Sequence, residues 1–522
     1  AERVEDGSGK DAHERGSNRE DARDDSDSER GEMYRLRSLR KPLSCKTGKR
    51  HQDRRPRSTQ NYLTTTAMKH DINRREFLRR GGAAALAIGG LGALNSCKSK
   101  GSGQAASQET DGVSGEMTYR TNPKTGEKIS ILGYGCMRWP MIKDKDGKDI
   151  IDQEAVNRLI DHALESGINY FDTAPMYLQG QSEEATANAL VRHPRESYYL
   201  ATKLSNFGDF TYEGALEMYR RSFKRLQTDH IDYYLLHSLG GGGIENFNKR
   251  FIDNGVLEFL LKEREAGRIR NLGFSFHGDS ETFTQLLELH EKYHWDFVMI
   301  QMNYLDWTHA GGATAEFMYT ELEKRGIPVN IMEPLLGGRL SKVPDHIAER
   351  LKERNPQGTV ASWAFRFAGS HKGVMTVLSG MTYMEHLKDN LKTYSPLVPL
   401  TEDEFAFLEE TAGLISSYPT VPCNDCKYCM PCPYGIDIPA ILLHYNKCVN
   451  EGHISQSQQD ENYRKARRAY LVSYDRAVPK LRQADRCIGC NQCSINCPQK
   501  INIPNELHKI NRYIEKLKQE TL

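Results

Sequence analysis

Short apolar runs alternate with amphipathic segments from about residue 128 to residue 394. In the longer segments apolar residues recur at helical spacing, as in Gln153–Ser166, Tyr212–Leu226, Glu281–His294 and Ala315–Arg325. The short runs have the length and the β-branched or aromatic content of strands. Eight of them stand in chain order: Ile131–Cys136, Ile168–Asp172, Tyr198–Lys203, Ile231–His237, Ile269–Ser275, Phe297–Gln301, Val329–Glu333 and Val374–Leu378. This alternation predicts an α/β fold, a parallel (β/α)8 or TIM barrel. A doubly wound open sheet is the alternative, but the first strand–helix turn lacks a GxGxxG motif.

The last hundred residues follow a different pattern, in which a cysteine motif occurs twice. The copies are Cys423, Cys426, Cys429, Cys432-Pro433 and Cys487, Cys490, Cys493, Cys497-Pro498. Each copy is followed at the same offset by Ile-x-Ile-Pro, at Ile436–Pro439 and Ile501–Pro504. Three closely spaced cysteines and a fourth before proline are typical of a chain that binds an iron–sulfur cube. The repeat therefore predicts two [4Fe–4S] clusters.

The spacing also predicts which cysteines share a cluster. In two-cluster ferredoxins the fourth cysteine of each run binds the other cluster. That pattern assigns Cys423, Cys426, Cys429 and Cys497 to one cluster, and Cys487, Cys490, Cys493 and Cys432 to the other. The first run has only two residues before its last cysteine, which leaves the place of Cys432 open. Two zinc sites are the alternative, and disulfides among cysteines so crowded would be strained. Helical periodicity over 438–484 favours an α-helical ferredoxin-like domain.

The first 116 residues contain three compositionally distinct segments. Residues 1–67 are rich in charged residues, Ser and Gly, which predicts disorder, and we expect the native start to be Met68. Residues 68–97 resemble a twin-arginine export signal, with Arg74-Arg75 before a short apolar run. That run ends at Cys97, which resembles the lipidated cysteine of a lipobox and would attach the protein to a membrane. Residues 98–116 have the composition of a linker.

These segments predict a location outside the cytoplasm. The twin-arginine route carries folded proteins, so clusters could be inserted before export. We expect a periplasmic protein, or one lipid-anchored at the outer face of the inner membrane or at the outer membrane. The net charge of +1 and the lack of basic–aromatic interleaving argue against a nucleic-acid partner. The expected domains are a barrel over 117–395 and a cluster domain over 396–522.

Polar residues end three consecutive predicted strands. These are Asp172, Lys203 and His237. In a TIM barrel the C-terminal ends of strands carry the catalytic groups. Each residue also has an ordinary structural interpretation, as a helix cap, a surface lysine or a hydrogen-bonded core histidine. Their occurrence on three successive strands favours a shared catalytic site.

These residues carry a family resemblance. Asn169–Ala174, Tyr177, Lys203 and Leu236-His237 resemble the catalytic tetrad of the aldo-keto reductases over residues 117–395. The chain is similar to the subgroup that joins this barrel to a C-terminal ferredoxin-type module. The resemblance implies that Tyr177 is the general acid and that Lys203, paired with Asp172, makes it more acidic. It implies that His237 polarises the substrate oxygen.

The resemblance also implies a nicotinamide cofactor, NADP(H) or NAD(H). It places Ser275 and Gln301 at the nicotinamide amide, with Asn303 and Tyr304 nearby. The pyrophosphate loop and the adenosine end are implied at Glu333, Pro334, Leu335, Gly337, Ser379, Gly380, Asp389 and Asn390. No Lys or Arg stands at Met381–Thr382, where family members specific for NADPH hold the 2′-phosphate.

The expected function is interconversion of a small-molecule carbonyl and an alcohol, linked to electron transfer through the clusters. A redox partner protein is a further expectation. Two alternatives stay open: a reductase whose clusters are only structural, and a docking subunit that holds cofactor with slow or no catalysis. The strand–helix loops carry no group that identifies the substrate.

Overall fold

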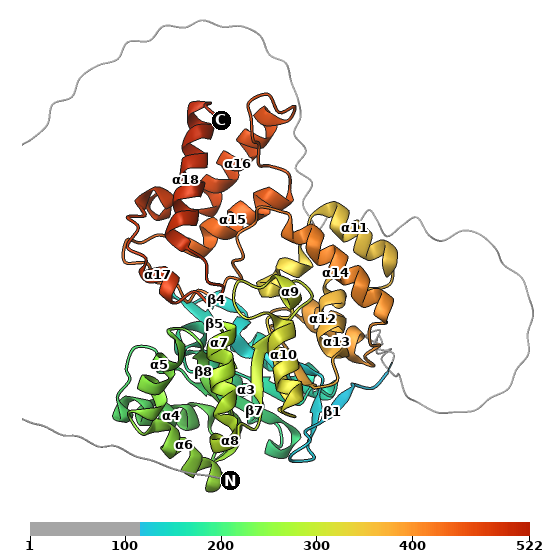
Figure 1. Cartoon of the computed structure of the whole chain (residues 1–522), viewed down its shortest axis with the longest axis vertical. Coiled ribbons are helices and arrows are strands. Elements are labelled where there is room, and N and C mark those ends of the chain that lie inside the picture. Colours follow the sequence, from blue (N-terminus) through green and yellow to red (C-terminus); the bar gives the residue numbers. More distant parts are fainter. Residues whose placement is uncertain (1–114) are drawn as a thin grey trace, which may run out of the picture. The chain divides into compact units, whose positions relative to one another are not determined.

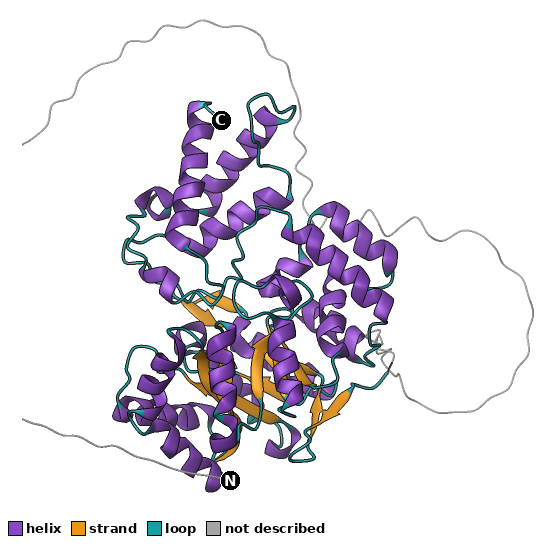
Figure 2. Ribbon diagram, in the orientation of Figure 1, coloured by secondary structure: helices purple, strands orange, loops and turns teal. Residues whose placement is uncertain are grey.

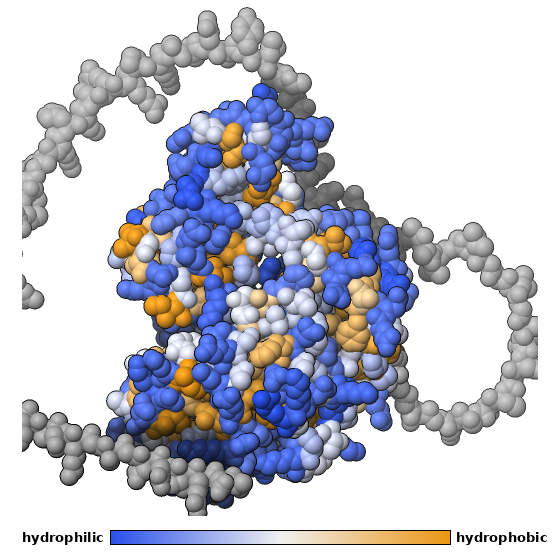
Figure 3. Space-filling view, viewed as in Figure 1, coloured by the Kyte–Doolittle hydropathy of each residue, from blue (hydrophilic) through white to orange (hydrophobic). Residues whose placement is uncertain are grey.

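The computed structural model of this protein describes residues 115–522. The predicted disordered segment, the export signal, Cys97 and most of the predicted linker lie outside the described residues. No helix within 115–522 has the length and apolar content that a membrane crossing requires. Figure 3 shows one face of the molecule, on which hydrophilic residues predominate and apolar groups are interspersed.

Eight parallel strands form a closed barrel, which confirms the predicted fold (Figure 2). The strands are β3 (Leu132–Gly135), β6 (Tyr170–Asp172), β7 (Tyr199–Leu204), β8 (Ile231–Leu239), β9 (Ile269–Phe276), β10 (Val298–Gln301), β11 (Val329–Met332) and β12 (Val374–Ser379). Each strand pairs with its neighbour along the chain, and β12 pairs with β3 through Val377–Leu132 to close the ring. Tyr170, Tyr233 and Phe297 are among the fully buried side chains that fill the interior.

Helices alternate with these strands as the sequence predicted. The barrel helices are α2 (Gln153–Glu165), α3 (Ser182–Leu190), α4 (Tyr212–Leu226), α5 (Gly243–Phe247), α6 (Val256–Glu265), α7 (Ser280–Glu288), α8 (His290–Tyr293), α9 (Asp306–His309), α10 (Ala315–Lys324), α11 (Asp345–Arg354), α12 (Val360–Ser370) and α13 (Met384–Tyr394). A hairpin of β4 (Met141–Lys143) and β5 (Asp149–Ile151) follows the first barrel strand. Short 3₁₀ or π turns occur at Cys136–Arg138, Tyr177–Gly180, Arg195–Ser197, Asn248–Ile252 and Leu336–Ser341.

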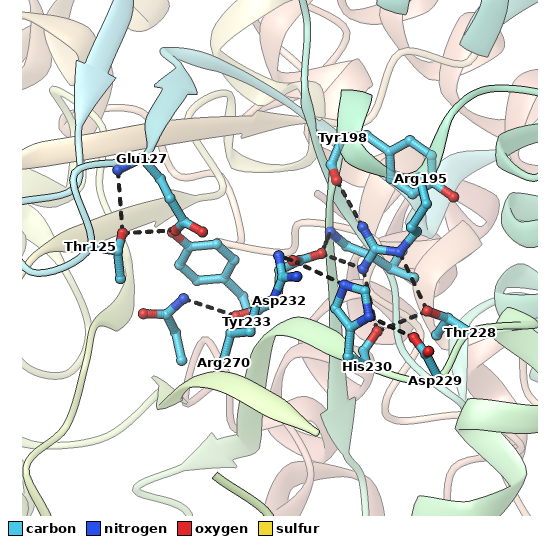
Figure 4. Close-up of polar contacts among 12 residues, drawn as sticks. Thr125, Glu127, Arg195, Tyr198, Thr228, Asp229, His230, Asp232, Tyr233 and Arg270 are labelled. Carbon is cyan, nitrogen blue, oxygen red and sulfur yellow. Dashed lines mark hydrogen bonds and ion pairs between the residues drawn. The ribbon is translucent and has the colours of Figure 1, made fainter. Parts of the chain in front are cut away.

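A second hairpin closes the N-terminal end of the barrel. It is formed by β1 (Tyr119–Thr121) and β2 (Lys128–Ser130), and Ile129 of β2 is buried with the barrel interior. Tyr233, near the start of β8, hydrogen-bonds Asn122 and Glu127 of this hairpin (Figure 4).

The buried Asp232 forms a second polar cluster at the same end of the barrel (Figure 4). Its carboxylate accepts hydrogen bonds from Arg195 at 2.5 Å and from Arg270 at 2.8 Å. The amide of Leu200 donates a third at 2.9 Å. Because ion pairs and hydrogen bonds both compensate its burial, Asp232 can fasten three elements of the barrel floor together.

The C-terminal segment forms a separate helical group with its own core (Figure 1). Its helices are α15 (Ile438–Asn450), α16 (Tyr463–Ala477), α17 (Gln492–Ile495) and α18 (Ile503–Gln519), with 3₁₀ turns at Lys480–Arg482 and Ala484–Arg486. Asp437 and Asn502 cap α15 and α18 at equivalent points of the repeat, with Pro439 and Pro504 in the first turns. The repeated Ile-x-Ile-Pro motif is therefore a helix start.

The boundary between the two domains differs from the predicted one. Helix α14 (Glu402–Ser416) buries Leu408, Ala412 and Ile415 in the barrel core, and its Glu410 pairs with Arg350 of α11. The separate C-terminal core begins at Val421. The predicted boundary at residue 395 assigned α14 to the cluster domain, whereas in the structure this helix packs with the barrel.

Candidate active site at the barrel mouth

The predicted tetrad residues come together at the C-terminal ends of neighbouring strands. Asp172 is the last residue of β6, Lys203 lies near the end of β7, and His237 lies near the end of β8. Tyr177 opens the 3₁₀ turn that follows β6. Strands β6, β7 and β8 are adjacent and parallel, so their carboxyl ends meet at one edge of the barrel.

Lys203 and Asp172 form a buried ion pair. The Lys203 ammonium donates to Asp172 Oδ1 at 2.5 Å and to the Thr173 carbonyl at 2.8 Å. The two residues are only 1% and 3% exposed. Burial raises the pKa of Asp172, and the charge and hydrogen bond of Lys203 oppose that rise. The pair fixes a cation below the tyrosine, as the sequence predicted.

Tyr177 lies between the lysine and the histidine. The Lys203 Nζ atom is 4.9 Å from the centre of the Tyr177 ring, and the His237 ring is 5.9 Å away in an edge-on arrangement. Burial raises the pKa of Tyr177 well above its ordinary value, and the nearby Tyr428 and Asp172 add to the rise. The resemblance led us to expect a more acidic phenol. The shift in this structure has the opposite direction, because burial disfavours the charged phenolate.

His237 is hydrogen-bonded on both ring nitrogens. Ser205 Oγ lies 2.5 Å from Nδ1, and the hydroxyl of Tyr428 lies 3.2 Å from Nε2. Burial lowers the pKa of His237 well below its ordinary value, and the charges of Lys203 and Arg250 lower it further. His237 is therefore a neutral imidazole, which can donate one N–H and accept one hydrogen bond.

Arg250 supports the histidine from below and was not singled out from the sequence. It is 2% exposed, donates to the His237 carbonyl at 2.8 Å, and lies over the Phe207 ring at 4.9 Å. Ser205 and Tyr428 were missed as well. Tyr428 could not be found from barrel patterns, because it lies between two cysteines of the first run.

The predicted nicotinamide residues lie at the same end of the barrel. Ser275 lies near the carboxyl end of β9 at the barrel mouth, and its hydroxyl accepts a hydrogen bond from the backbone N–H of Ser238 at 2.8 Å. The Gln301 amide donates to the buried Asp306 at 2.5 Å. It also pairs with Gln499, which follows the last cysteine of the second run: Gln499 Nε2 donates to Gln301 Oε1 at 2.7 Å, and the reverse hydrogen bond is 3.4 Å.

The predicted pyrophosphate loop has an unusual backbone. Glu333 and Leu336 adopt positive φ angles of 56° and 49°, and Gly337 and Gly338 adopt 65° and 101°. An added Cβ at Gly337 would lie 2.0 Å from the carbonyl oxygen of Asn424, so glycine is required there. Burial raises the pKa of Glu333 to about 7. Pro334 and Leu335 lie within this loop, whose Gly337 contacts Asn424 of the first cysteine run.

The residues predicted for the adenosine end are only partly brought together. The buried Asn390 donates to Ser379 Oγ at 2.9 Å. Gly380 lies against the side chain of Arg138, which an added Cβ would approach to 3.2 Å. Asp389 is instead bound to the Thr359 hydroxyl at 2.8 Å, at the N-cap of α12.

The eight motif cysteines are free thiols that fall into two groups. Burial raises the pKa of Cys429 to about 12, and the neighbouring Cys423 and Cys497 add to this rise. Burial also raises the pKa of Cys493, with contributions from Cys487, Cys432 and Cys490. Cys497 beside Cys429 and Cys432 beside Cys493 agree with crossed ligation, and Cys493, which is assigned to the other cluster, also contributes to the raised pKa of Cys429.

A single metal ion has no ready site in this region. Within residues 115–522 no group of three or more His, Cys, Asp or Glu side chains is arranged to hold one ion. In an iron–sulfur cube each thiolate binds a different iron, so four sulfurs surround a volume and do not converge on one point.

Comparison with known proteins identifies the barrel. The family model described as "Aldo/keto reductase family" matches residues 132–412. "Uncharacterized oxidoreductase YqkF" of Bacillus subtilis is 27% identical over 311 residues, which cover 54% of this chain and 92% of that protein. L-galactose dehydrogenase of Arabidopsis thaliana is 24% identical over 317 residues, covering 57% and 95%. The solved holo form of aldo-keto reductase AKR11C1 from Bacillus halodurans is 25% identical, with a TM-score of 0.46 over 57% of this chain and 96% of that chain. The family match spans most of the barrel and contains the assembled tetrad, and the chain belongs to the aldo/keto reductase family.

Proposed function

We propose that this oxidoreductase interconverts a small-molecule carbonyl and its alcohol with a nicotinamide cofactor, and that it carries two [4Fe–4S] clusters. The observation that carries the catalytic part is the assembly of Tyr177, Lys203, Asp172 and His237 at one edge of the barrel. A protonated phenol, a buried cation and a neutral imidazole together supply what carbonyl reduction requires.

The roles of the residues follow from their protonation states. A bound reduced nicotinamide supplies a hydride to the carbonyl carbon. Tyr177 is held protonated by burial and gives its proton to the oxygen as negative charge develops there. Lys203 lies 4.9 Å from the phenol ring and stabilises the phenolate that remains. Asp172 keeps that ammonium in place, because the pair is almost fully buried.

His237 completes the site as a hydrogen-bond donor. Its neutral ring can donate from Nε2 to the substrate oxygen only if the Ser205 hydroxyl donates to Nδ1. The short Ser205 contact is compatible with this tautomer, because a serine hydroxyl can donate to Nδ1. In the reverse direction the phenolate of Tyr177 would accept the proton of an alcohol.

The residues around Gln301 suit a nicotinamide amide. Gln301 already pairs in both directions with another carboxamide, that of Gln499. A nicotinamide ring carries the same group, so the position accepts a carboxamide. The glycine-rich loop at 336–338 and the Ser379–Asn390 pair would hold the remainder of the nucleotide. A solved relative from Klebsiella pneumoniae is described in complex with NADP and acetate. NADP(H) is our first choice here, although Met381–Thr382 supplies no cation for a 2′-phosphate.

The two cysteine groups support cluster binding. In the first group burial raises the thiol pKa values of Cys423, Cys426, Cys429 and Cys497. In the second group it raises that of Cys493. Iron binding would release these protons, because thiolate is the ligand form. Tyr428 stands between Cys426 and Cys429 and bonds His237, so the first group lies next to the catalytic residues. This contact favours clusters that take part in electron transfer, with a redox partner protein at the outer cluster.

The location outside the cytoplasm is part of the same proposal. It rests on the twin-arginine motif and on Cys97, both in the sequence before residue 115. A cofactor loaded with the folded protein before export would not need resupply.

One experiment tests the combined proposal. The full chain is purified without oxygen, its iron and sulfide are counted, and bound nucleotide is identified by mass spectrometry. We expect about eight irons per chain and a nicotinamide nucleotide that is oxidised when carbonyl compounds are added. Iron without any nucleotide binding would refute the reductase part, and nucleotide binding without iron would refute the cluster part.

A further inference from the structure

Two side chains of the cysteine runs occupy the positions expected for cofactor and substrate atoms. Gln499 is the first. Its carboxamide forms a reciprocal pair with Gln301, at 2.7 Å and 3.4 Å. The proposed function requires a nicotinamide carboxamide at the same Gln301. Gln301 Nε2 carries two N–H groups, and one of them donates to Asp306. Gln499 and a competing ligand would therefore share the single N–H that is left.

Tyr428 is the second side chain. Its hydroxyl lies 3.2 Å from Nε2 of His237, the atom that must donate to the substrate oxygen. The Phe207 ring, 6.3 Å from the Tyr428 ring and 5.2 Å from the His237 ring, packs on the same contact. One N–H makes one good hydrogen bond at a time, so a carbonyl oxygen can bind His237 only after this hydroxyl moves.

The backbone of the first run lies over the nucleotide loop as well. The Asn424 carbonyl stands so close to Gly337 that only a glycine fits. The same carbonyl accepts from Arg138 at 3.0 Å, and Asp425 lies 3.5 Å from the Arg138 guanidinium. A pyrophosphate at this loop would meet the backbone of residues 424–425.

The contacts between barrel and cysteine runs are mainly polar, with the Phe207–Tyr428 ring contact added, and the two hydrophobic cores are separate. The barrel core ends with Ile415 and the C-terminal core begins with Val421. Between them the named contacts are amide, hydroxyl and guanidinium hydrogen bonds. Domain interfaces of this kind release more readily than large apolar ones.

We propose that the cysteine runs are an internal ligand of the barrel, which competes with the nicotinamide and the substrate. In the docked state Gln499 holds Gln301, and Tyr428 holds His237. Nicotinamide binding requires Gln499 to leave Gln301, so cofactor affinity is lowered by the energy of docking. This inference rests on the proposed function, because it takes Gln301 and His237 in their proposed roles.

The test measures nucleotide affinity on the anaerobically purified full chain. NADPH and NADH are titrated into the wild type, Gln499→Ala and Gln499→Glu, and binding is followed by nucleotide fluorescence. The alanine removes one reciprocal amide pair, and the glutamate places a second carboxylate near Asp306. Both should bind nicotinamide nucleotide about tenfold more tightly. Gln492→Ala is the matched control, since Gln492 is an exposed glutamine in the same run, and its dissociation constants should equal those of the wild type.

A second measurement covers the case in which the variants lose their fold. Backbone hydrogen exchange at residues 424–428 of the wild type should become faster when NADPH is added. Equal or weaker binding by the Gln499 variants, or slower exchange at 424–428, would overturn competition while the proposed function stands. Failure of every variant and of the wild type to bind either nucleotide would overturn both.

Discussion

The crossed assignment of the cysteines can be tested by pairs of substitutions. Cys497 contributes to the raised pKa of Cys429, and Cys432 to that of Cys493, which agrees with runs that exchange their fourth cysteines. Cys493 contributes to the pKa of Cys429 as well, so both runs lie close together and substitutions are needed to decide the assignment. Cys423→Ala with Cys497→Ala should then damage one cluster only. Cys423→Ala with Cys432→Ala should damage both. Each intact cube holds about four irons, so the first double variant should retain about four per chain and the second about none.

Iron counting together with electron paramagnetic resonance of the reduced protein measures this difference. The spectrum of the first variant should show one intact cube without the coupling of a neighbouring cluster. Cys448→Ala serves as the control, because Cys448 is buried among helices and belongs to neither group; it should keep about eight irons. If each run binds its own cluster, the two double variants exchange their results, and that exchange would refute the crossed assignment. Equal iron in both would refute it as well.

Further outcomes are expected at the barrel and in the C-terminal core. Asp232→Ala should lower the free energy of unfolding by about 1–3 kcal/mol in denaturant titrations, since it leaves the buried amide of Leu200 without its acceptor and removes the ion pairs to the partly exposed Arg195 and Arg270; Asp229→Ala, whose side chain is 94% exposed, should change it by less than about 0.5 kcal/mol. Tyr177→Phe should lower turnover of any carbonyl substrate more than about a hundredfold, with an unchanged nucleotide dissociation constant; a matching loss of nucleotide affinity would show a binding role. Burial lowers the pKa of His444 to about 4, so stability present above the ordinary pKa near 6.5 is lost as pH falls toward 4. The thermal midpoint of His444→Gln should therefore depend less on pH over that interval than that of the wild type, and parallel curves would contradict this.

The tetrad could be predicted because it depends on local order. Strand periodicity fixes which residue ends each strand, and parallel pairing then brings Asp172, Lys203 and His237 to one edge. The direction of the Tyr177 pKa shift could not be predicted in the same way. It is set by burial of the phenol, with a smaller contribution from Tyr428, a residue of the C-terminal domain that strand patterns do not place near the barrel.

The contacts between the cysteine runs and the barrel could not be predicted from the sequence. The pairs Gln301–Gln499 and His237–Tyr428 join residues 198 and 191 positions apart, and no periodic pattern connects them. The predicted domain boundary at residue 395 differs from the one in the structure for a related reason. An amphipathic helix such as α14 shows that one face is buried, but the pattern does not show which of two cores receives it.

The hairpin under the barrel has a consequence for the order of events in a reaction cycle. Because β1 and β2 cover the floor and buried side chains such as Tyr170 and Tyr233 fill the interior, the described part of the chain leaves no path to Tyr177 along the barrel axis. Substrate and product must therefore both pass on the side of the strands' carboxyl ends, where the cysteine runs lie. If the cysteine runs compete for this site as proposed, their release precedes both arrival and departure.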